Sequence, residues 1–186
     1  MRVREAKKLL KASYRKNHKN YGDYEIDKSL SGNRVQVYKK RNSNEAVVVH
    51  RGTANMKDWV TDAGMALGYE SGKRFKHSEK IQKKAMEKYG TDNITTMGHS
   101  LGGRLAEKYH KGGGKIITVN KAATPRSILR VVPQNQIDIR NQNDPVSYLT
   151  KYQKYKVSPI ITNTKTINPI KAHKLSTLNP IIEMKL

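Results

Sequence analysis

The first residues of the chain place apolar side chains at the spacing of one helix face. Val3, Ala6, Leu10 and Tyr14 recur among eight basic residues within the first twenty positions. Side chains three or four positions apart lie on the same side of a helix. The spacing therefore predicts an amphipathic, basic helix over residues 2–16.

The rest of the chain alternates between short strand-like runs and helical patterns. β-Branched or alternating runs predict six strands, at residues 24–30, 34–38, 45–50, 93–97, 115–119 and 136–140. Helical patterns occupy residues 74–89 and 101–111, and glycine follows each of them. Helices that alternate with short strands predict the α/β class, with a central, mostly parallel sheet and helices on both faces.

Length and composition favour one folded unit. A chain of 186 residues is the size of one domain with one core, so we expect a single domain over residues 1–186. Lys and Arg outnumber Asp and Glu by 37 to 15, the net charge is +22 and the mean hydropathy is -0.80. This composition borders on that of disordered chains, but the clustering of apolar residues into blocks indicates a folded protein.

Several classes of protein are excluded by what the sequence lacks. The chain has no cysteine, which rules out disulfides, zinc ribbons and a thiol nucleophile. No apolar stretch follows the basic N-terminal residues, and the longest aliphatic run, residues 46–49, is far too short to span a bilayer. We expect a soluble or peripheral protein, cytoplasmic or packaged in a virus particle. No histidine or carboxylate cluster has metal-ligand spacing, so neither a metal nor a cofactor is expected.

The most specific chemical motif is Gly98-His-Ser-Leu-Gly102, a G-x-S-x-G sequence between a predicted strand and a predicted helix. In a nucleophile elbow, a serine sits on a strained strand-to-helix turn, and small residues on either side let the backbones approach. Gly98 and Gly102 meet that need, which predicts Ser100 as a nucleophile exposed at the top of the sheet. The N–H groups that begin the next helix would stabilise an oxyanion. The alternative is an ordinary glycine-marked turn.

A nucleophilic serine also needs a carboxylate that orients its histidine. Asp144 fits best among the acids after Ser100, because it follows a predicted strand end in a loop that Pro145 stiffens. Its alternative is an Asx turn without a catalytic role. Asp138 lies inside a predicted strand and Glu107 on the helix after the nucleophile, so both are weaker candidates.

Two histidines follow the predicted nucleophile, and His173 is the candidate base because it lies late in the chain, after the acid. A lone histidine is otherwise more often a surface or packing residue. His110 is better explained as a cation near a helix C-terminus. Before the serine, His99 is expected to point away from the site and His50 to be structural.

The motifs occur in the order in which they appear in a known family. The chain resembles the class 3 lipase family of α/β-hydrolases in six successive blocks, at Val47–Thr53, Lys57–Asp62, Met97–Gly103, Thr124–Arg126, Asn143–Val146 and His173. The resemblance covers roughly residues 34–175 and implies a hydrolase of lipid acyl esters, either a triacylglycerol lipase or a phospholipase A1-like enzyme. It also implies a triad of Ser100, Asp144 and His173. The matching oxyanion-hole positions are Thr53 and the N–H of Leu101.

The sequence departs from that family in the segment where such lipases carry a lid. Residues 54–68 keep few bulky apolar side chains, which argues against a large lid. Trp59, the chain's one tryptophan, is interpreted as packing against the next helix, with a lid or acyl-pocket role as the alternative.

The positive charge is concentrated at the two ends of the chain. From Lys151 onward, seven lysines face one acidic residue, Glu183. Such a field draws a protein to anionic phospholipid, and it equally attracts nucleic acid. We expect a lipid ester substrate and an anionic membrane or lipid surface as partners. The alternative is a basic nucleic-acid- or capsid-associated structural protein that retains a hydrolase fold. The sequence does not indicate an oligomeric state.

Overall fold

The computed structural model describes residues 1–15, 18–53, 72–166 and 168–186. Its central element is a seven-stranded sheet of order β1-β2-β3-β4-β5-β7-β9. The first three strands pair antiparallel, and from the third strand onward every pairing is parallel. The strands are β1 (Tyr24–Ile26), β2 (Val35–Lys40), β3 (Ala46–His50), β4 (Ile94–His99), β5 (Ile116–Val119), β7 (Gln136–Asn141) and β9 (Ile160–Thr162).

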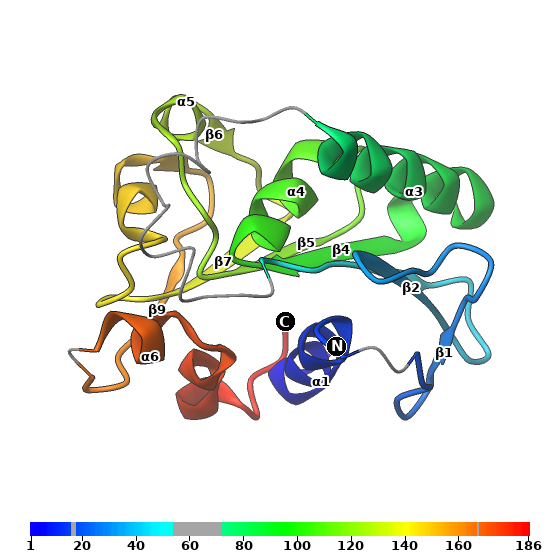
Figure 1. The fold of residues 1–186 in the computed structure, drawn as a ribbon, viewed down its shortest axis with the longest axis horizontal. Helices are drawn as coiled ribbons and strands as arrows, with labels where there is room; N and C mark the ends of the chain where they lie inside the picture. Colours follow the sequence, from blue (N-terminus) through cyan, green and yellow to red (C-terminus); the bar gives the residue numbers. More distant parts are fainter. Residues whose placement is uncertain (16–17, 54–71, 167) are drawn as a thin grey trace.

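Helices cover both faces of this sheet, as the sequence predicts. On one face lie α1 (Val3–Ser13), α6 (Pro169–His173) and the 3₁₀ segment η3 (Leu175–Ile181), and on the other lie α3 (Lys73–Tyr89) and α4 (Leu101–Tyr109) (Figure 1). Because both faces are covered, β3 is buried along its whole length and reads as a continuous apolar run. The arrangement is that of an α/β-hydrolase.

Smaller elements fill the connections. They are η1 (Thr91–Asn93), α5 (Pro125–Ile128), η2 (Tyr148–Tyr152) and the two short strands β6 (Val131–Val132) and β8 (Lys154–Tyr155), which pair parallel. The sequence pattern does not reveal these strands or β9, which hold two or three residues each, whereas β1, with three residues, lies within the predicted strand 24–30.

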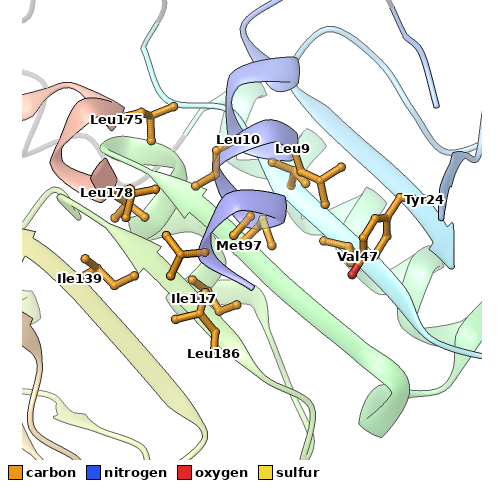
Figure 2. Close-up of a cluster of buried hydrophobic side chains, with 14 of the residues drawn as sticks. Leu9, Leu10, Tyr24, Val47, Met97, Ile117, Ile139, Leu175, Leu178 and Leu186 are labelled. Carbon is orange, nitrogen blue, oxygen red and sulfur yellow. The ribbon is translucent and has the colours of Figure 1, made fainter. Parts of the chain in front are cut away.

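The core beneath the sheet joins the two ends of the chain. Leu9 and Leu10 of α1 pack with Met97 of β4 and with Leu175 and Leu178 of η3 (Figure 2). The termini themselves also pair, since the N–H of Val3 donates to the carbonyl of Met184 and Arg2 bridges Lys185 in antiparallel fashion. Residues from both termini thus form one face of the core.

The N-terminal helix is shorter than predicted. It begins at Val3 and ends at Ser13, whereas the sequence pattern predicts residues 2–16. Tyr14 caps the helix and its hydroxyl turns toward the end of β4, where it contacts His99. No helix in the described part of the chain is both long enough and apolar enough to cross a membrane.

Candidate active site

Four segments that follow strands bring the candidate residues together at one edge of the sheet. Residues 51–53 follow β3, Ser100 follows β4, Asp144 follows β7, and His173 lies in the segment that follows β9. The strands β3, β4, β7 and β9 run parallel, so their carboxyl ends lie at the same edge. In open α/β sheets, that edge is where ligands bind.

The turn at Ser100 has the geometry of a nucleophile elbow. Ser100 adopts φ 59° and ψ -129°, a strained conformation for a residue that is not glycine. A Cβ added to Gly98 would lie 2.1 Å from the carbonyl carbon of Gly102, and one added to Gly102 would lie 2.0 Å from the carbonyl oxygen of His50. Only glycine fits at either position, because the backbones touch there.

Hydrogen bonds hold this strained turn on the sheet. The N–H of Ser100 donates to the carbonyl of Val119 at 3.0 Å, and the N–H of Ala122 donates to the carbonyl of Ser100 at 3.1 Å. The serine backbone is therefore fixed between β4 and the end of β5.

Ser100 is buried, so the prediction that it is exposed is wrong. Part of the reason is the loop after β3, because a Cβ added to Gly52 would lie only 3.1 Å from the Cβ of Ser100. Its Oγ has no hydrogen-bond partner among the described residues. Catalytic hydrogen bonds are often long in proteins without a bound substrate, so this does not exclude a nucleophilic role.

Asp144 and His173 are in direct contact and both are fully buried. Oδ1 of Asp144 lies 2.8 Å from Nδ1 of His173. A carboxylate only accepts hydrogen bonds, so Nδ1 carries the proton, and in the neutral ring Nε2 carries the lone pair that a general base uses. The loop thus places an acid and a histidine in the relation that a triad requires.

The Asp144 carboxylate is also the centre of its own loop. It accepts hydrogen bonds from the N–H of Val146 at 3.1 Å, the N–H of Ser147 at 3.1 Å and the hydroxyl of Ser147 at 2.6 Å. Asp144 therefore forms an Asx turn and also pairs with His173, because the turn fixes the carboxylate in the orientation in which it meets the imidazole.

The other candidate acids lie in a separate buried cluster on the α4 side of the sheet. Asp138 accepts from Lys121 Nζ at 2.6 Å and from the hydroxyl of Thr118 at 2.6 Å. Glu107 pairs with the same Lys121 and with Arg104. Both carboxylates are already neutralised by buried cations, and neither is paired with His173 in the described structure.

The prediction that His99 points away from the site is wrong. Its ring centroid lies 4.8 Å from that of His173, and its Nε2 donates to the His173 carbonyl at 2.7 Å. Burial lowers the pKa of His99 to about 3, and the neighbouring His173 adds to the effect. Because a neutral ring carries one proton and Nε2 uses it, Nδ1 accepts the hydroxyl of Tyr14 at 2.8 Å.

Tyr14 supports the site, whereas its helical spacing in the sequence identifies it only as an apolar helix residue. A Cβ added to Gly52 would lie 2.3 Å from the Tyr14 hydroxyl. The hydroxyl therefore contacts the loop after β3 as well as His99. Burial raises the pKa of Tyr14, and a backbone hydrogen bond from Gly52 opposes that rise. The hydroxyl stays protonated and acts as a fixed donor.

Two further residues position the candidate site. Asn120 has a positive φ of 44°, its Nδ2 donates to the carbonyl of Ala172 at 3.2 Å, and its Oδ1 accepts from the N–H of Asn141 at 2.8 Å. Arg74 donates to the carbonyls of Arg51 and Gly52. Asn120 thus anchors the segment that carries the candidate base, and Arg74 anchors the loop after β3. No signal in the sequence indicated either contact.

His50 and His110 are part of the core. His50 is buried, with Nε2 2.9 Å from Oε1 of Gln82, and burial lowers its pKa to about 4. The prediction of His110 as a helix-end cation is wrong, because burial lowers its pKa and its Nδ1 lies 2.8 Å from the hydroxyl of Thr96. Its ring turns inward at the end of α4, toward Gly114, rather than into solvent.

The predicted oxyanion-hole residues come from two segments, the start of α4 and the loop after β3. Leu101 is the first residue of α4, where a helix N–H has no intrahelical acceptor. Thr53 is half-buried and follows Gly52, where an added Cβ would lie 3.1 Å from the Cβ of Ser100. Residues 54–68, the position of the lid in class 3 lipases, lie outside the described residues, and so does Trp59. Within the described ranges, no three His, Asp or Glu side chains gather as metal ligands.

A pocket of about 530 Å³ opens beside the loop that carries the candidate acid. It is lined by Gln142, Asn143, Asp144, Pro145 and Tyr148. Tyr148 is exposed and the cation of Lys151 lies 3.6 Å from its ring centroid. This pocket is a concave surface adjoining the candidate triad.

Comparison with known proteins agrees with this architecture. The profile of the Phospholipase-like family, described as a Tle-like phospholipase domain, matches residues 8–150. A triacylglycerol lipase from Penicillium expansum superposes with a TM-score of 0.57 at 17% identity, covering 87% of this chain and 78% of that one. A Rhizomucor miehei lipase propeptide complex gives 0.47 at 14% identity, covering 77% and 59%. No curated protein sequence matches the chain.

Proposed function

We propose, from the premise that this chain belongs to the Phospholipase-like family of Tle-like phospholipase domains, that Ser100, His173 and Asp144 form the catalytic triad of a lipid ester hydrolase. The observation that carries the proposal is the buried hydrogen bond between His173 Nδ1 and Asp144 Oδ1, at the same sheet edge as the strained serine turn. The fold shared with a triacylglycerol lipase supports the same class of reaction.

The proposed reaction has two steps. Ser100 Oγ attacks the ester carbonyl while His173 Nε2 takes its proton, and Asp144 stabilises the imidazolium that forms. The N–H of Leu101 and the Thr53 position donate hydrogen bonds to the oxyanion. The tetrahedral intermediate collapses, His173 returns the proton to the leaving alkoxide, and an acyl-serine remains. Water activated by the same histidine then releases the fatty acid and restores the serine.

Within lipid esters, the proposed substrate is the acyl ester of a glycerophospholipid, with a phospholipase A1-like position of cleavage. The family description and the excess of positive charge support a phospholipid over a neutral triacylglycerol, because cations favour an anionic surface. Hydrolysis rates on dispersed phosphatidylglycerol and on a triacylglycerol of equal chain length separate the two. A higher rate on the triacylglycerol would refute this choice of substrate.

The triad is tested by labelling with a fluorophosphonate and by mass spectrometry. A covalent adduct on Ser100 is expected, and Ser100→Ala should abolish both the adduct and ester hydrolysis, a loss of about 10⁴-fold or more. An unlabelled Ser100 with full hydrolysis would refute the assignment.

The identity of the acid is tested by a matched pair of variants. Asp144→Asn should reduce kcat by about 10⁴-fold, because the amide cannot hold the histidine in the required tautomer. Asp138→Asn is the control, since it carries the same chemical change in the buried Lys121 cluster. If the Asp138→Asn protein is folded but inactive and the Asp144→Asn protein is active, the catalytic acid is Asp138 and our assignment of Asp144 is refuted.

A further inference from the structure

A pocket of about 480 Å³ lies where the end of α1 meets the turn after α6. It is lined by Lys11, Tyr14, Arg15, His99, Lys174, Leu175 and Ser176. Three lining side chains are cationic and none is acidic. The three cations come from both ends of the sequence, so the fold and not the local sequence assembles them.

The cations of this pocket are not used by the fold. Lys11, Arg15 and Lys174 are exposed, and none has an ion-pair partner within the described ranges of the chain. Like charges that converge on one cavity repel each other, and an anion between them removes that repulsion. The pocket therefore has the electrostatics of an anion site.

The lining chemistry suits a phosphate group with an organic substituent. An arginine guanidinium presents two parallel N–H donors that match two phosphate oxygens, and lysines add point charges. Ser176 adds a hydroxyl at the rim, while Leu175 and the Tyr14 ring provide apolar wall. The volume is in the range of pockets that hold small molecules.

We propose that this pocket binds the phosphate of a glycerophospholipid headgroup, so that the enzyme is seated on an anionic lipid surface. The inference rests on the proposed function, because it takes a phospholipid layer as the site of action. A concave pocket with three cations holds one phosphate, whereas a nucleic acid requires a track of cations along its backbone. The headgroup is therefore the favoured ligand.

The bound headgroup would lie directly behind the candidate catalytic histidine. Lys174 follows His173 in sequence, and the pocket walls include Tyr14 and His99, which hold the His173 carbonyl through two successive hydrogen bonds. A ligand held by Lys11, Arg15 and Lys174 bridges α1 and the α6 turn. Those two segments are the ones that position His99 and His173.

Binding is measured on a Ser100→Ala background, so that no lipid is hydrolysed and the result does not depend on catalysis. The pocket variant combines Lys11→Gln, Arg15→Gln and Lys174→Gln. The control variant combines Lys76→Gln, Lys80→Gln and Lys84→Gln, three exposed lysines of α3 on the opposite face of the sheet (Figure 1). Both variants lose three positive charges, and equal thermal melting temperatures establish that both are folded.

Two probes distinguish a free phosphate from a lipid headgroup. Glycerol 3-phosphate is titrated while the amide NMR shifts of Lys11, Arg15 and Ser176 are followed. Vesicles of phosphatidylglycerol in phosphatidylcholine are then tested by co-sedimentation. The parent and the control variant should bind both probes, and the pocket variant should bind each of them roughly tenfold or more weakly.

Three results would overturn the proposal. Equal loss of vesicle binding in the two variants would mean that diffuse charge, and not a site, holds the lipid. If the pocket variant loses glycerol 3-phosphate binding but binds vesicles as the parent does, the ligand of the pocket is a soluble phosphate. If a single-stranded oligonucleotide displaces the protein from vesicles and glycerol 3-phosphate does not, the partner of the pocket is a nucleic acid. Loss of ester hydrolysis in Ser100→Ala is scored separately, so either proposal can fail alone.

Discussion

Two buried, neutral histidines should make the protein less stable in mild acid. Burial lowers the pKa of His50 to about 4 and that of His99 to about 3, from an unfolded value of 6.5. A folded pKa below the unfolded one gives stability that is present above pH 6.5 and is lost as the pH falls toward the folded value. The unfolded chain takes up two protons that the folded protein refuses.

The loss of stability at about pH 5.5 does not depend on how far below that pH the folded-state pKa values of the two histidines lie. At about pH 5.5, each of these histidines is protonated in the unfolded chain and neutral in the folded protein. One pH unit below the unfolded pKa costs about 1.4 kcal/mol for each ring, and so about 2.8 kcal/mol for the pair. His110, whose pKa burial also lowers, adds in the same direction.

The Asp27 carboxylate does not obscure this effect. Burial alone would raise the pKa of Asp27, but hydrogen bonds from Lys88, Ser29 and Tyr89 outweigh it and lower the pKa to about 2. Stability from Asp27 is therefore lost only as the pH falls below its unfolded value of 3.8. The interval around pH 6 isolates the histidines.

Urea unfolding at about pH 7.5 and about pH 5.5 measures the loss. The free energy of unfolding of the wild-type protein should fall by about 2.8 kcal/mol or more between the two pH values. In a His50→Gln, His99→Gln double variant, this fall should be smaller by about 2.8 kcal/mol. His77→Gln, at an exposed position of α3, is the control and should behave as wild type. Identical pH dependence in the wild type and the double variant would refute the reasoning. His50→Gln alone, expected to recover half, serves if the double variant does not fold.

Three further substitutions test the construction of the site. Gly102→Ala places a Cβ 2.0 Å from the His50 carbonyl oxygen and should destabilise the fold by roughly 3 kcal/mol, read from thermal melting, whereas Gly32→Ala, with open space around it, should change nothing. Tyr14→Phe leaves His99 Nδ1 without its donor, so a loss of about 1–3 kcal/mol and a lower kcat at unchanged KM are expected; an unaltered kcat would contradict a positioning role. Thr53→Val should lower kcat by roughly 10 to 1,000-fold on a soluble ester, and a change confined to KM would instead assign Thr53 to substrate binding.

The sequence predicts those parts of the site that local chemistry determines. The turn at Ser100 can be predicted from the sequence because such strained turns require glycine at fixed offsets, as the contacts of Gly98 and Gly102 demonstrate. The Asp144 loop is legible because a short carboxylate before proline favours one turn, and that turn orients the carboxylate. Strands of four or more residues are predicted to within a few residues, because β-branched or alternating runs mark them.

Contacts between distant segments could not be predicted in this way. Tyr14 and His99 are 85 positions apart, and nothing in the helical spacing of the first residues indicates which strand end the tyrosine reaches. The burial of His110 and Ser100 likewise follows from the packing of other loops against them, which a single sequence does not encode locally. Asn120 lies at the end of a strand like many asparagines, and only the fold reveals that it ties α6 to the sheet.

The shared core of α1 and η3 has a consequence for how the protein matures during synthesis. The ribosome makes Leu9 and Leu10 well before Leu175, Leu178 and Leu186, which pack with them. Translation proceeds at roughly 5–20 residues per second, so the apolar face of α1 waits several seconds or longer for its C-terminal partners. His173 precedes Leu175 by two residues, so it is made at the same late stage. A nascent chain, or one truncated before residue 173, should therefore be both inactive and prone to aggregate.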